Sequence, residues 1–394
     1  MSLGPTRFHR ALRDTLTSQE PGLFRWYSSD SYEAERNDRM RLELLRSSYR
    51  LSPESHERPY RLAREAAAKI GVEVPIVLYQ LNQGERANAG LCFTRDEAHV
   101  VLSGPLLSSL NDAELLALFG HELAHHRLLT LEDGAFHTMA ELVEASAARG
   151  GAPFVEAALR NRRWTEIFAD RGAMMAGGSI EPAIACLVKV GTGLGDVSAK
   201  DYLAQAREVI ARLAGNDGAS GETHPENAVR AVALELWHEK GDVADEEIAT
   251  LVEGAMRLEA LDVVQQRSVA DLTRALLDRI LVPAWMRTET TLAHARRFFP
   301  EYEHTAPSTP GTPWPASLAD YGAYVLLDFA VVDDALAEVA LARAQAVARE
   351  LGVREAFAAL ARKELKMTAA ALTQLESRAT SLFERAAKQT ETPA

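Results

Sequence analysis

The feature that most constrains this chain is a pair of histidines four residues apart with a glutamate between them, in the sequence His121-Glu122-Leu123-Ala124-His125. Positions i and i+4 lie on one face of a helix, so His121 and His125 can both direct a ring nitrogen at one cation. Glu122 projects from the neighbouring face. From there it can reach a water molecule without occupying a coordination position. This H-E-x-x-H arrangement is the core of a zinc hydrolase site.

The residues before this motif predict the helix that would hold it. Asn111 suits an N-cap, and Glu114 stands three residues later, which is the spacing of a capping box. Leucines at helical spacing follow and supply an apolar stripe that can face a core. We therefore expect a helix from about Asp112 to Leu129. Gly120 lies within it, and close packing explains this glycine at least as well as a functional role does.

A hydrolytic zinc site has three protein ligands and one open position, so a third ligand is needed. The metzincin continuation is absent, because Leu128 and Leu131 stand where that class has a glycine and a histidine. The other arrangement takes a glutamate from a later helix.

Glu166 and Asp170 fit this second arrangement, since they stand at i and i+4 and would share one helix face. Glu166 would bind the metal. Asp170 would accept a hydrogen bond from the outer nitrogen of a ligand histidine and fix its orientation. The alternative is an ordinary charged helix face, on which these carboxylates pair with Arg162 or Arg163.

A third element begins after the loop at residues 215–221, where His224 and Pro225 precede a predicted helix. Pro225 suits the first helical turn. His224 would lie at the mouth of this helix, available to stabilise the oxyanion that forms when water attacks a peptide carbonyl. A plain helix-start role also fits His224. Arg230 could act from the same face.

In this order the three motifs resemble those of the M48 family of zinc metallopeptidases, whose members carry H-E-x-x-H, a downstream E-x-x-x-D and a later H-P-x-x-x-x-R. The resemblance covers roughly residues 50 to 240. It implies a gluzincin site with one Zn²⁺ per chain, bound by His121, His125 and Glu166, with Glu122 as the general base and with Asp170 and Arg230 around the ligands.

Upstream, Ala87-Asn88-Ala89 and the segment 98–103 are similar to the Asn-Ala segment of the family and to the strand before its active-site helix. Gly90 stands where the family has phenylalanine. The resemblance implies an edge strand that pairs with the substrate backbone. We expect the peptide to lie extended along residues 98–103 by β-augmentation. The residues predicted to contact it are Asn88, His99, Val100 and Val101, although His99 also fits a packing role.

The composition agrees with a globular enzyme. The chain has 394 residues, of which 47% are hydrophobic and 25% charged, enough to bury a sizeable core and more than one folding unit. The net charge of −13 argues against nucleic acid and acidic membrane surfaces as default partners. The expected partner is a peptide or protein substrate. The sequence does not indicate an oligomeric state.

The two cysteines, Cys92 and Cys186, provide no disulfide framework, as expected of a reducing compartment. We find no apolar signal region at the start and no run of about 18 apolar residues that could span a bilayer. These features predict a cytoplasmic protein.

We predict an α+β fold that is mostly helical, with a small sheet and the H-E-x-x-H helix in a gluzincin-type domain. A stretch with four prolines from Pro307 to Pro315 cannot be helical and is interpreted as a linker. The expected divisions are a helical segment at 1–50, the catalytic domain at 51–245, a helical extension at 246–302, the proline-rich linker at 303–316 and a helical module at 317–394 that faintly resembles the TerB-like fold.

These features together predict a zinc-dependent metalloendopeptidase in which Glu122 is the general base. The alternative is a latent or catalytically silent zinc protein that binds partners through its C-terminal helices. The intact Glu122 argues against a silent protein. A purely structural zinc site is normally closed by a fourth Cys or His, and the sequence offers no extra cysteine near the motif.

Overall fold

The structure is a computed structural model that describes residues 3–27, 30–81, 87–213, 227–305 and 314–391. It is mostly helical with one small mixed sheet, as the predicted α+β class requires. The chain divides into two compact units, one formed by Met1–Gly254 with Asp262–Val264 and the other by Ala255–Leu261 with Gln265–Ala394. The domain boundaries expected from the sequence remain predictions.

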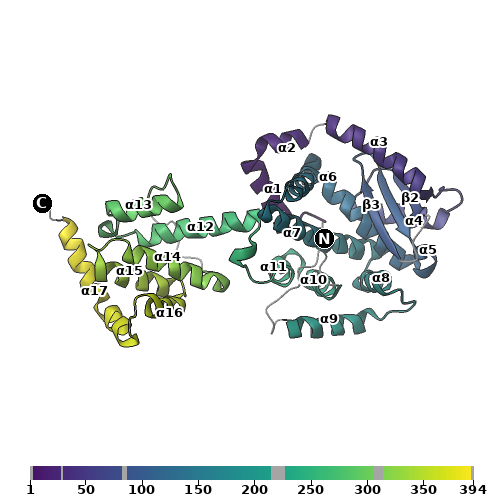
Figure 1. The fold of residues 1–394 in the computed structure, drawn as a ribbon. Coiled ribbons are helices and arrows are strands. Elements are labelled where there is room, and N and C mark those ends of the chain that lie inside the picture. Colours follow the sequence, from purple (N-terminus) through teal and green to yellow (C-terminus); the bar gives the residue numbers. More distant parts are fainter. Residues whose placement is uncertain (1–2, 28–29, 82–86, 214–226, 306–313, 392–394) are drawn as a thin grey trace. The chain divides into compact units, whose positions relative to one another are not determined.

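The first unit contains the sheet and the predicted catalytic motifs (Figure 1). Its elements in chain order are α1 (Arg7–Gln19), α2 (Pro21–Tyr27), α3 (Asp30–Ser47), β1 (Ser48–Arg50), α4 (Glu57–Ile70), β2 (Ile76–Leu81), β3 (Asn88–Phe93), β4 (Ala98–Ser103), α5 (Leu106–Ser109), α6 (Asp112–Ala148), α7 (Ala152–Gly177), α8 (Ile180–Thr192), α9 (Ala199–Leu213), α10 (Asn227–Lys240), the 3₁₀ helix η1 (Gly241–Ala244) and α11 (Asp245–Glu253).

The sheet has the strand order β1-β2-β4-β3. β4 pairs in parallel with β2, where Leu78 lies opposite Val100, and antiparallel with β3, where Gly90 lies opposite Val101. β4 is therefore an internal strand. The prediction that residues 98–103 form an edge strand for the substrate is wrong, because both sides of β4 are already paired. The edge next to β4 is β3.

Helix α6 begins where the sequence predicts. Asn111 accepts a hydrogen bond from the backbone N–H of Glu114 at 3.0 Å, and the Glu114 carboxylate accepts one from the backbone N–H of Asn111 at 3.0 Å, so the capping box is formed. The element runs to Ala148, but its backbone leaves the helical conformation from Leu131 to Gly134. The first helical part thus ends close to the predicted Leu129, and a kink separates it from the second part.

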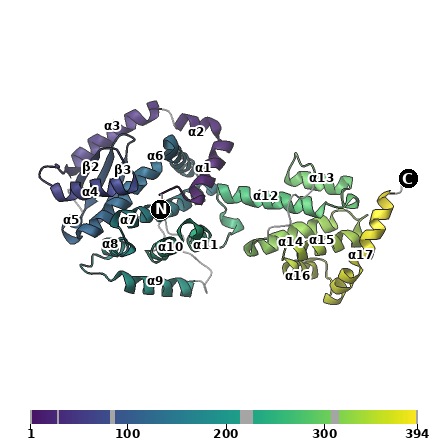
Figure 2. The ribbon, with the colours of Figure 1, turned by 180° about the vertical axis from the view of Figure 1, so that it is seen from behind.

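Helices α6 and α7 pack with their backbones in close approach. A Cβ atom on Gly120 would lie 2.4 Å from the Cβ of Ala176 and 2.6 Å from the carbonyl oxygen of Gly172. Only glycine allows this contact, because any side chain would force the two helices apart. The approach holds the H-E-x-x-H face of α6 against the face of α7 that carries Glu166. Helices α8 to α11 lie on one side of α7 and the sheet on the other (Figures 1 and 2).

The second unit is helical throughout its described residues. Its elements are η2 (Leu258–Ala260), α12 (Val263–Ile280, of which the first two residues belong to the first unit), η3 (Ala284–Met286), α13 (Glu289–Phe298), η4 (Ala316–Leu318), α14 (Ala319–Val331), α15 (Ala337–Glu350), α16 (Arg354–Glu364) and α17 (Ala369–Glu391).

One hydrophobic core unites this second unit. Leu277 and Ile280 of α12 share it with Leu326 and Phe329 of α14. Residues on both sides of the predicted linker therefore contribute to the same core. Residues 306–313, which contain most of that linker, lie outside the described part of the chain.

Candidate active site

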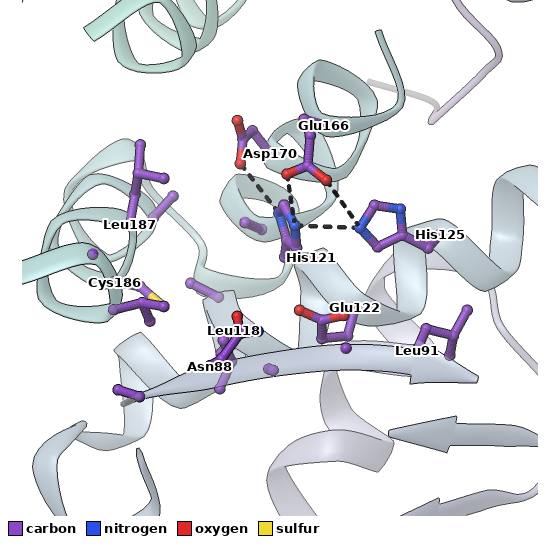
Figure 3. A pocket seen from close by; sticks show the side chains of 18 of the residues that line it. Asn88, Leu91, Leu118, His121, Glu122, His125, Glu166, Asp170, Cys186 and Leu187 are labelled. Carbon is purple, nitrogen blue, oxygen red and sulfur yellow. Dashed lines mark hydrogen bonds and ion pairs between the residues drawn. The ribbon is translucent and has the colours of Figure 1, made fainter. Parts of the chain in front are cut away.

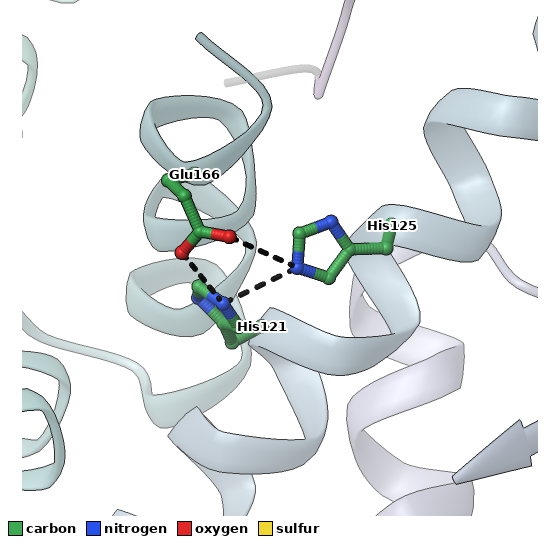
Figure 4. Close-up of side chains that lie close together, drawn as sticks. All are labelled: His121, His125 and Glu166. Carbon is green, nitrogen blue, oxygen red and sulfur yellow. Dashed lines mark hydrogen bonds and ion pairs between the residues drawn. The ribbon is translucent and has the colours of Figure 1, made fainter. Parts of the chain in front are cut away.

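Three side chains from two helices converge on one point. His121 and His125 of α6 direct their Nε2 atoms toward each other at 3.3 Å. The carboxylate of Glu166 on α7 approaches both, with Oε2 3.5 Å from Nε2 of His121 and Oε1 3.9 Å from Nε2 of His125 (Figure 4). This is the group that the sequence predicts as metal ligands.

The geometry of this group fits a zinc ion. One donor atom from each residue lies within 4.8 Å of the other two. Two ligands about 2.0–2.1 Å from a tetrahedral zinc lie roughly 3.3 Å apart, and this is the spacing of the two histidine nitrogens. Two neutral imidazoles and one carboxylate are also a usual donor set for catalytic zinc. Among the residues that the structure describes, this is the one His, Cys, Asp and Glu cluster that could hold a metal.

Asp170 and Arg230 surround the three candidate ligands. Oδ1 of Asp170 lies 3.1 Å from Nδ1 of His121, so the hydrogen bond expected between Asp170 and a ligand histidine is present. Arg230 of α10 donates to Asp170 through Nε at 2.8 Å and Nη2 at 2.7 Å, and its Nη1 lies 3.1 Å from Oε2 of Glu166. An Nδ1–H on His121 that donates to Asp170 leaves Nε2 free for a cation.

Burial and charge set the protonation of the two histidines in opposite directions. Burial lowers the pKa of His121, but the hydrogen bonds and charges of Asp170 and Glu166 outweigh it and raise the pKa to about 10. Burial and, after it, the charge of the neighbouring His121 lower the pKa of His125 to about 4. The charges of Glu166 and Asp170 thus favour a positive charge at this point.

Glu122 lies beside the cluster without joining it. Its side chain is buried and lines the same cavity as the candidate ligands. Burial raises the pKa of Glu122 to about 7, with a further contribution from the charge of Glu166 and an opposing one from His121 and Arg230. A carboxyl group with this pKa can both accept and release a proton near neutral pH.

A cavity of about 920 Å³ opens in front of these residues. β3 forms one wall of it, with Asn88 and Leu91 on either side of Glu122 (Figure 3). Helix α8 forms the opposite wall. Of the four residues predicted to contact a substrate, Asn88 lines the cavity, whereas His99, Val100 and Val101 of the internal strand β4 do not.

The sequence analysis missed the wall formed by α8. Ala183, Cys186, Leu187 and Val190 line the cavity at helical spacing. This apolar stripe directly follows the E-x-x-x-D helix, so periodicity could have identified it. Cys186 is a buried free thiol, and Cys92 is a partly buried one.

His224 lies outside the described residues, as does the start of the segment that carries it, so its predicted role is not addressed by the geometry. Arg230, at the end of the same motif, does reach the site.

Comparison with known proteins gives one result. Residues 53–238 match the model of peptidase family M48. The curated proteins and the solved structures gave no significant match. Among the described residues, no helix has the length and apolar character needed to cross a bilayer. The matched range contains the capped helix α6, all three candidate ligands and Arg230. Residues 53–238 therefore form a domain of peptidase family M48, which supports a metallopeptidase function.

Proposed function

We propose that this protein is a zinc-dependent metalloendopeptidase that hydrolyses internal peptide bonds of proteins or peptides. The observation that carries the proposal is the position of Glu122, which is buried beside the His121, His125 and Glu166 cluster and faces the same cavity. A structural metal site has no need of such a carboxylate.

His121, His125 and Glu166 would hold one Zn²⁺ per chain. When bound, this ion would supply Lewis acidity that lowers the pKa of a water molecule and polarises the scissile carbonyl. Asp170 fixes the ring of His121 through Nδ1, and Arg230 fixes both carboxylates. All three nitrogen atoms of the Arg230 guanidinium take part in these contacts. We therefore assign Arg230 a positioning role.

In this mechanism Glu122 is first the general base and then the general acid. Its carboxylate takes a proton from the attacking water and later delivers it to the nitrogen of the leaving amine, so the carboxylate is regenerated. The burial that raises the pKa of Glu122 suits both steps. His224 remains a proposed hydrogen-bond donor to the oxyanion, on the grounds of the sequence motif alone.

The substrate backbone would pair with β3, the edge strand beside the cavity. An extended peptide can add to a sheet edge through main-chain hydrogen bonds, while pockets take alternate side chains. β3 replaces the strand 98–103 in this role, because β4 has no free edge. The two free cysteines support the cytoplasm as the proposed compartment.

Metal analysis combined with hydrolysis of unfolded casein tests this proposal. The purified protein should contain one zinc per chain. Glu122→Gln should keep the zinc and lose hydrolysis by at least about a hundredfold, because proton transfer contributes at least that factor. Glu65→Gln, on the surface of α4, is the matched control and should leave both quantities unchanged.

Glu166→Ala should weaken zinc binding. Undiminished cleavage by Glu122→Gln would show that another group is the base. If Glu166→Ala keeps full affinity while a change at Glu132, Asp133 or His137 abolishes it, the third ligand is misassigned.

A further inference from the structure

Apolar side chains flank the H-E-x-x-H motif at both ends along α6. Leu118 stands three residues before His121, and Leu129 stands four residues after His125, so these four side chains share one helix face. All four line the active-site cavity. At 1.5 Å per residue, about 16 Å of helix separates the two leucines. An extended peptide covers this length with roughly five residues, so one bound segment can reach both ends.

Strand β3 adds a second apolar wall at the end of the cavity beyond His125. Leu91 lies opposite Val100 of β4, and both side chains pack against the same hydrophobic core. Leu91 lies on the same side of Glu122 as His125 (Figure 3). Unlike Val100, both Leu91 and Leu129 are partly exposed and line the cavity, so a bound peptide can contact them. We call these two leucines the first subsite.

Helix α8 supplies the apolar wall at the opposite end. Leu187 and Val190 line the cavity there and are partly exposed. Leu118 and Cys186, which are almost fully buried, also line this end, and Cys186 and Leu187 lie on the side of Glu122 opposite to the first subsite (Figure 3). Burial raises the pKa of Cys186 to about 12, so its thiol adds no charge. We call Leu187 and Val190 the second subsite.

Among the described residues that line the cavity, the charged side chains all belong to the reacting site. Apart from the two ligand histidines, they are Glu122, Glu166, Asp170 and Arg230, which are already assigned to proton transfer, to the metal or to its support. Neither subsite contains a charged residue. A charged substrate side chain would therefore lose hydration there without gaining a partner, whereas an apolar one gains from leaving water.

We propose that each subsite takes an apolar side chain of the substrate, so that the protein cuts segments with large apolar residues on both sides of the scissile bond. The inference rests on the proposed function and names its substrate class. Leucine, isoleucine, valine, phenylalanine and methionine are among the residues that folded proteins most often bury. Segments of this kind are accessible in unfolded chains, so the expected substrates are unfolded polypeptides.

The distribution of cut sites is the first test. Zinc-loaded wild-type protein is incubated with unfolded casein, and the cut bonds are identified by mass spectrometry. Large apolar residues should be enriched at one position on each side of the cut bond, within roughly five residues of each other, and charged residues should be depleted there. Cut bonds flanked by charged residues as often as the casein sequence itself would overturn the inference and leave the proposed function intact. This test needs no variant.

Two charged variants test which side chains form the subsites. A peptide that spans one cut site is compared with two counterparts, each with a lysine in place of one flanking apolar residue. The wild type should cut both lysine peptides at least about tenfold more slowly in kcat/KM. Leu187→Glu should raise kcat/KM for one lysine peptide by about tenfold, and Leu91→Glu for the other, because the new carboxylate pairs with the lysine.

Leu194→Glu is the matched control for these variants. Leu194 follows the end of α8, is 56% exposed and does not line the cavity, so this variant should cut all three peptides at wild-type rates. The zinc content of every variant should equal that of the wild type. If Leu187→Glu and Leu91→Glu keep the wild-type preference, or favour the same lysine peptide, the assignment of the two subsites is wrong.

Binding without turnover separates the inference from the proposed function. Zinc-loaded Glu122→Gln should bind the apolar peptide at least about tenfold more tightly than either lysine peptide, as measured by fluorescence anisotropy. If the wild type cuts no peptide but Glu122→Gln shows this difference, the proposed function fails and the subsites stand. If Glu122→Gln binds all three peptides equally, the subsites are refuted.

Discussion

At the scale of single residues, the site depends on charge balance in a buried space. The carboxylates of Glu166 and Asp170 lie beside each other, and the guanidinium of Arg230 contacts both. Burial raises the pKa of Asp170, but the charge and hydrogen bonds of Arg230, with a smaller effect of His121, hold it below its usual range. Removal of one partner from such a set leaves a buried charge without compensation.

A pH-dependent loss of stability is expected from His9 of α1, which lies far from the motifs in sequence. Burial, with the charges of Arg171 and Arg10, lowers the pKa of His9 to about 3. Between pH 3 and about pH 6.5, His9 is protonated in the unfolded chain but not in the folded chain. The contribution of His9 to stability is therefore complete above pH 6.5. It falls by up to about 1.4 kcal/mol per pH unit as the solution is acidified.

Urea unfolding of the wild type and of His9→Gln at pH 7.5 and pH 5 measures this effect. Glutamine suits the same capping-box position and does not titrate. The free energy of unfolding should fall more between the two pH values in the wild type than in the variant. Equal losses would show that His9 is protonated in the folded protein.

The candidate metal ligands and Asp170 could be predicted from the sequence because their spacing is local. On a helix, the i and i+4 spacing puts His121 and His125 on one face, and likewise Glu166 and Asp170, independently of the tertiary fold. The position of Cys186 and Leu187 of α8 in the wall of the same cavity could not be predicted from local spacing, because it depends on contacts between distant segments.

At the scale of elements, the capped helix α6 and the strand at residues 98–103 form where the sequence predicts, but this strand is internal and not at the edge of the sheet. The capping box of α6 formed as predicted, since it involves neighbours in the chain. The order of the strands depends on contacts between distant segments. Residues 98–102 form a nearly continuous apolar run, which is typical of an internal strand, whereas β3 contains Asn88 and Gly90, which suit an edge.

The contact between α6 and α7 makes a prediction at this scale. Gly120→Ala should destabilise the protein by about 1–3 kcal/mol, because the added methyl group would overlap Ala176 and the backbone at Gly172. It should also weaken zinc binding, since His121 moves with Gly120. Gly22→Ala in α2 is the control. A Cβ there meets nothing within 4 Å, so stability should stay equal or rise slightly.

Thermal unfolding and zinc titration of both variants check this prediction. A Gly120→Ala protein with wild-type stability and zinc affinity would mean that the two helices can separate without cost.

At the scale of the whole molecule, the two compact units have separate hydrophobic cores. All proposed ligands lie in the first unit. The second unit draws its core from α12 on one side of the proline-rich segment and from α14 to α16 on the other. The prolines identified a break in helical structure, but proline content alone does not show which helices pack together afterwards.

Two truncated chains test whether residues 265–305 fold with the first unit or with the C-terminal helices. A chain that ends at Val264 should stay folded and bind zinc, because it contains the first core and Asp262, which pairs with Arg160 at 2.5 Å. A chain that ends at Thr305 should aggregate or unfold at lower temperature, since Leu277 and Ile280 would lose the partners that bury them. Size-exclusion chromatography and zinc analysis compare the two. The reverse order of stability would show that residues 265–305 belong with the catalytic unit.

The close approach of α6 and α7 limits how this enzyme can be switched off. His121 and Glu166 stand on two helices that cannot slide past each other while Gly120 and Gly172 remain in contact. A regulator that acted by pulling these two residues apart would have to break this close contact between the two helix backbones. Natural regulators and designed drugs should instead compete for the groove beside β3, and screening for inhibitors should begin with extended peptide mimics.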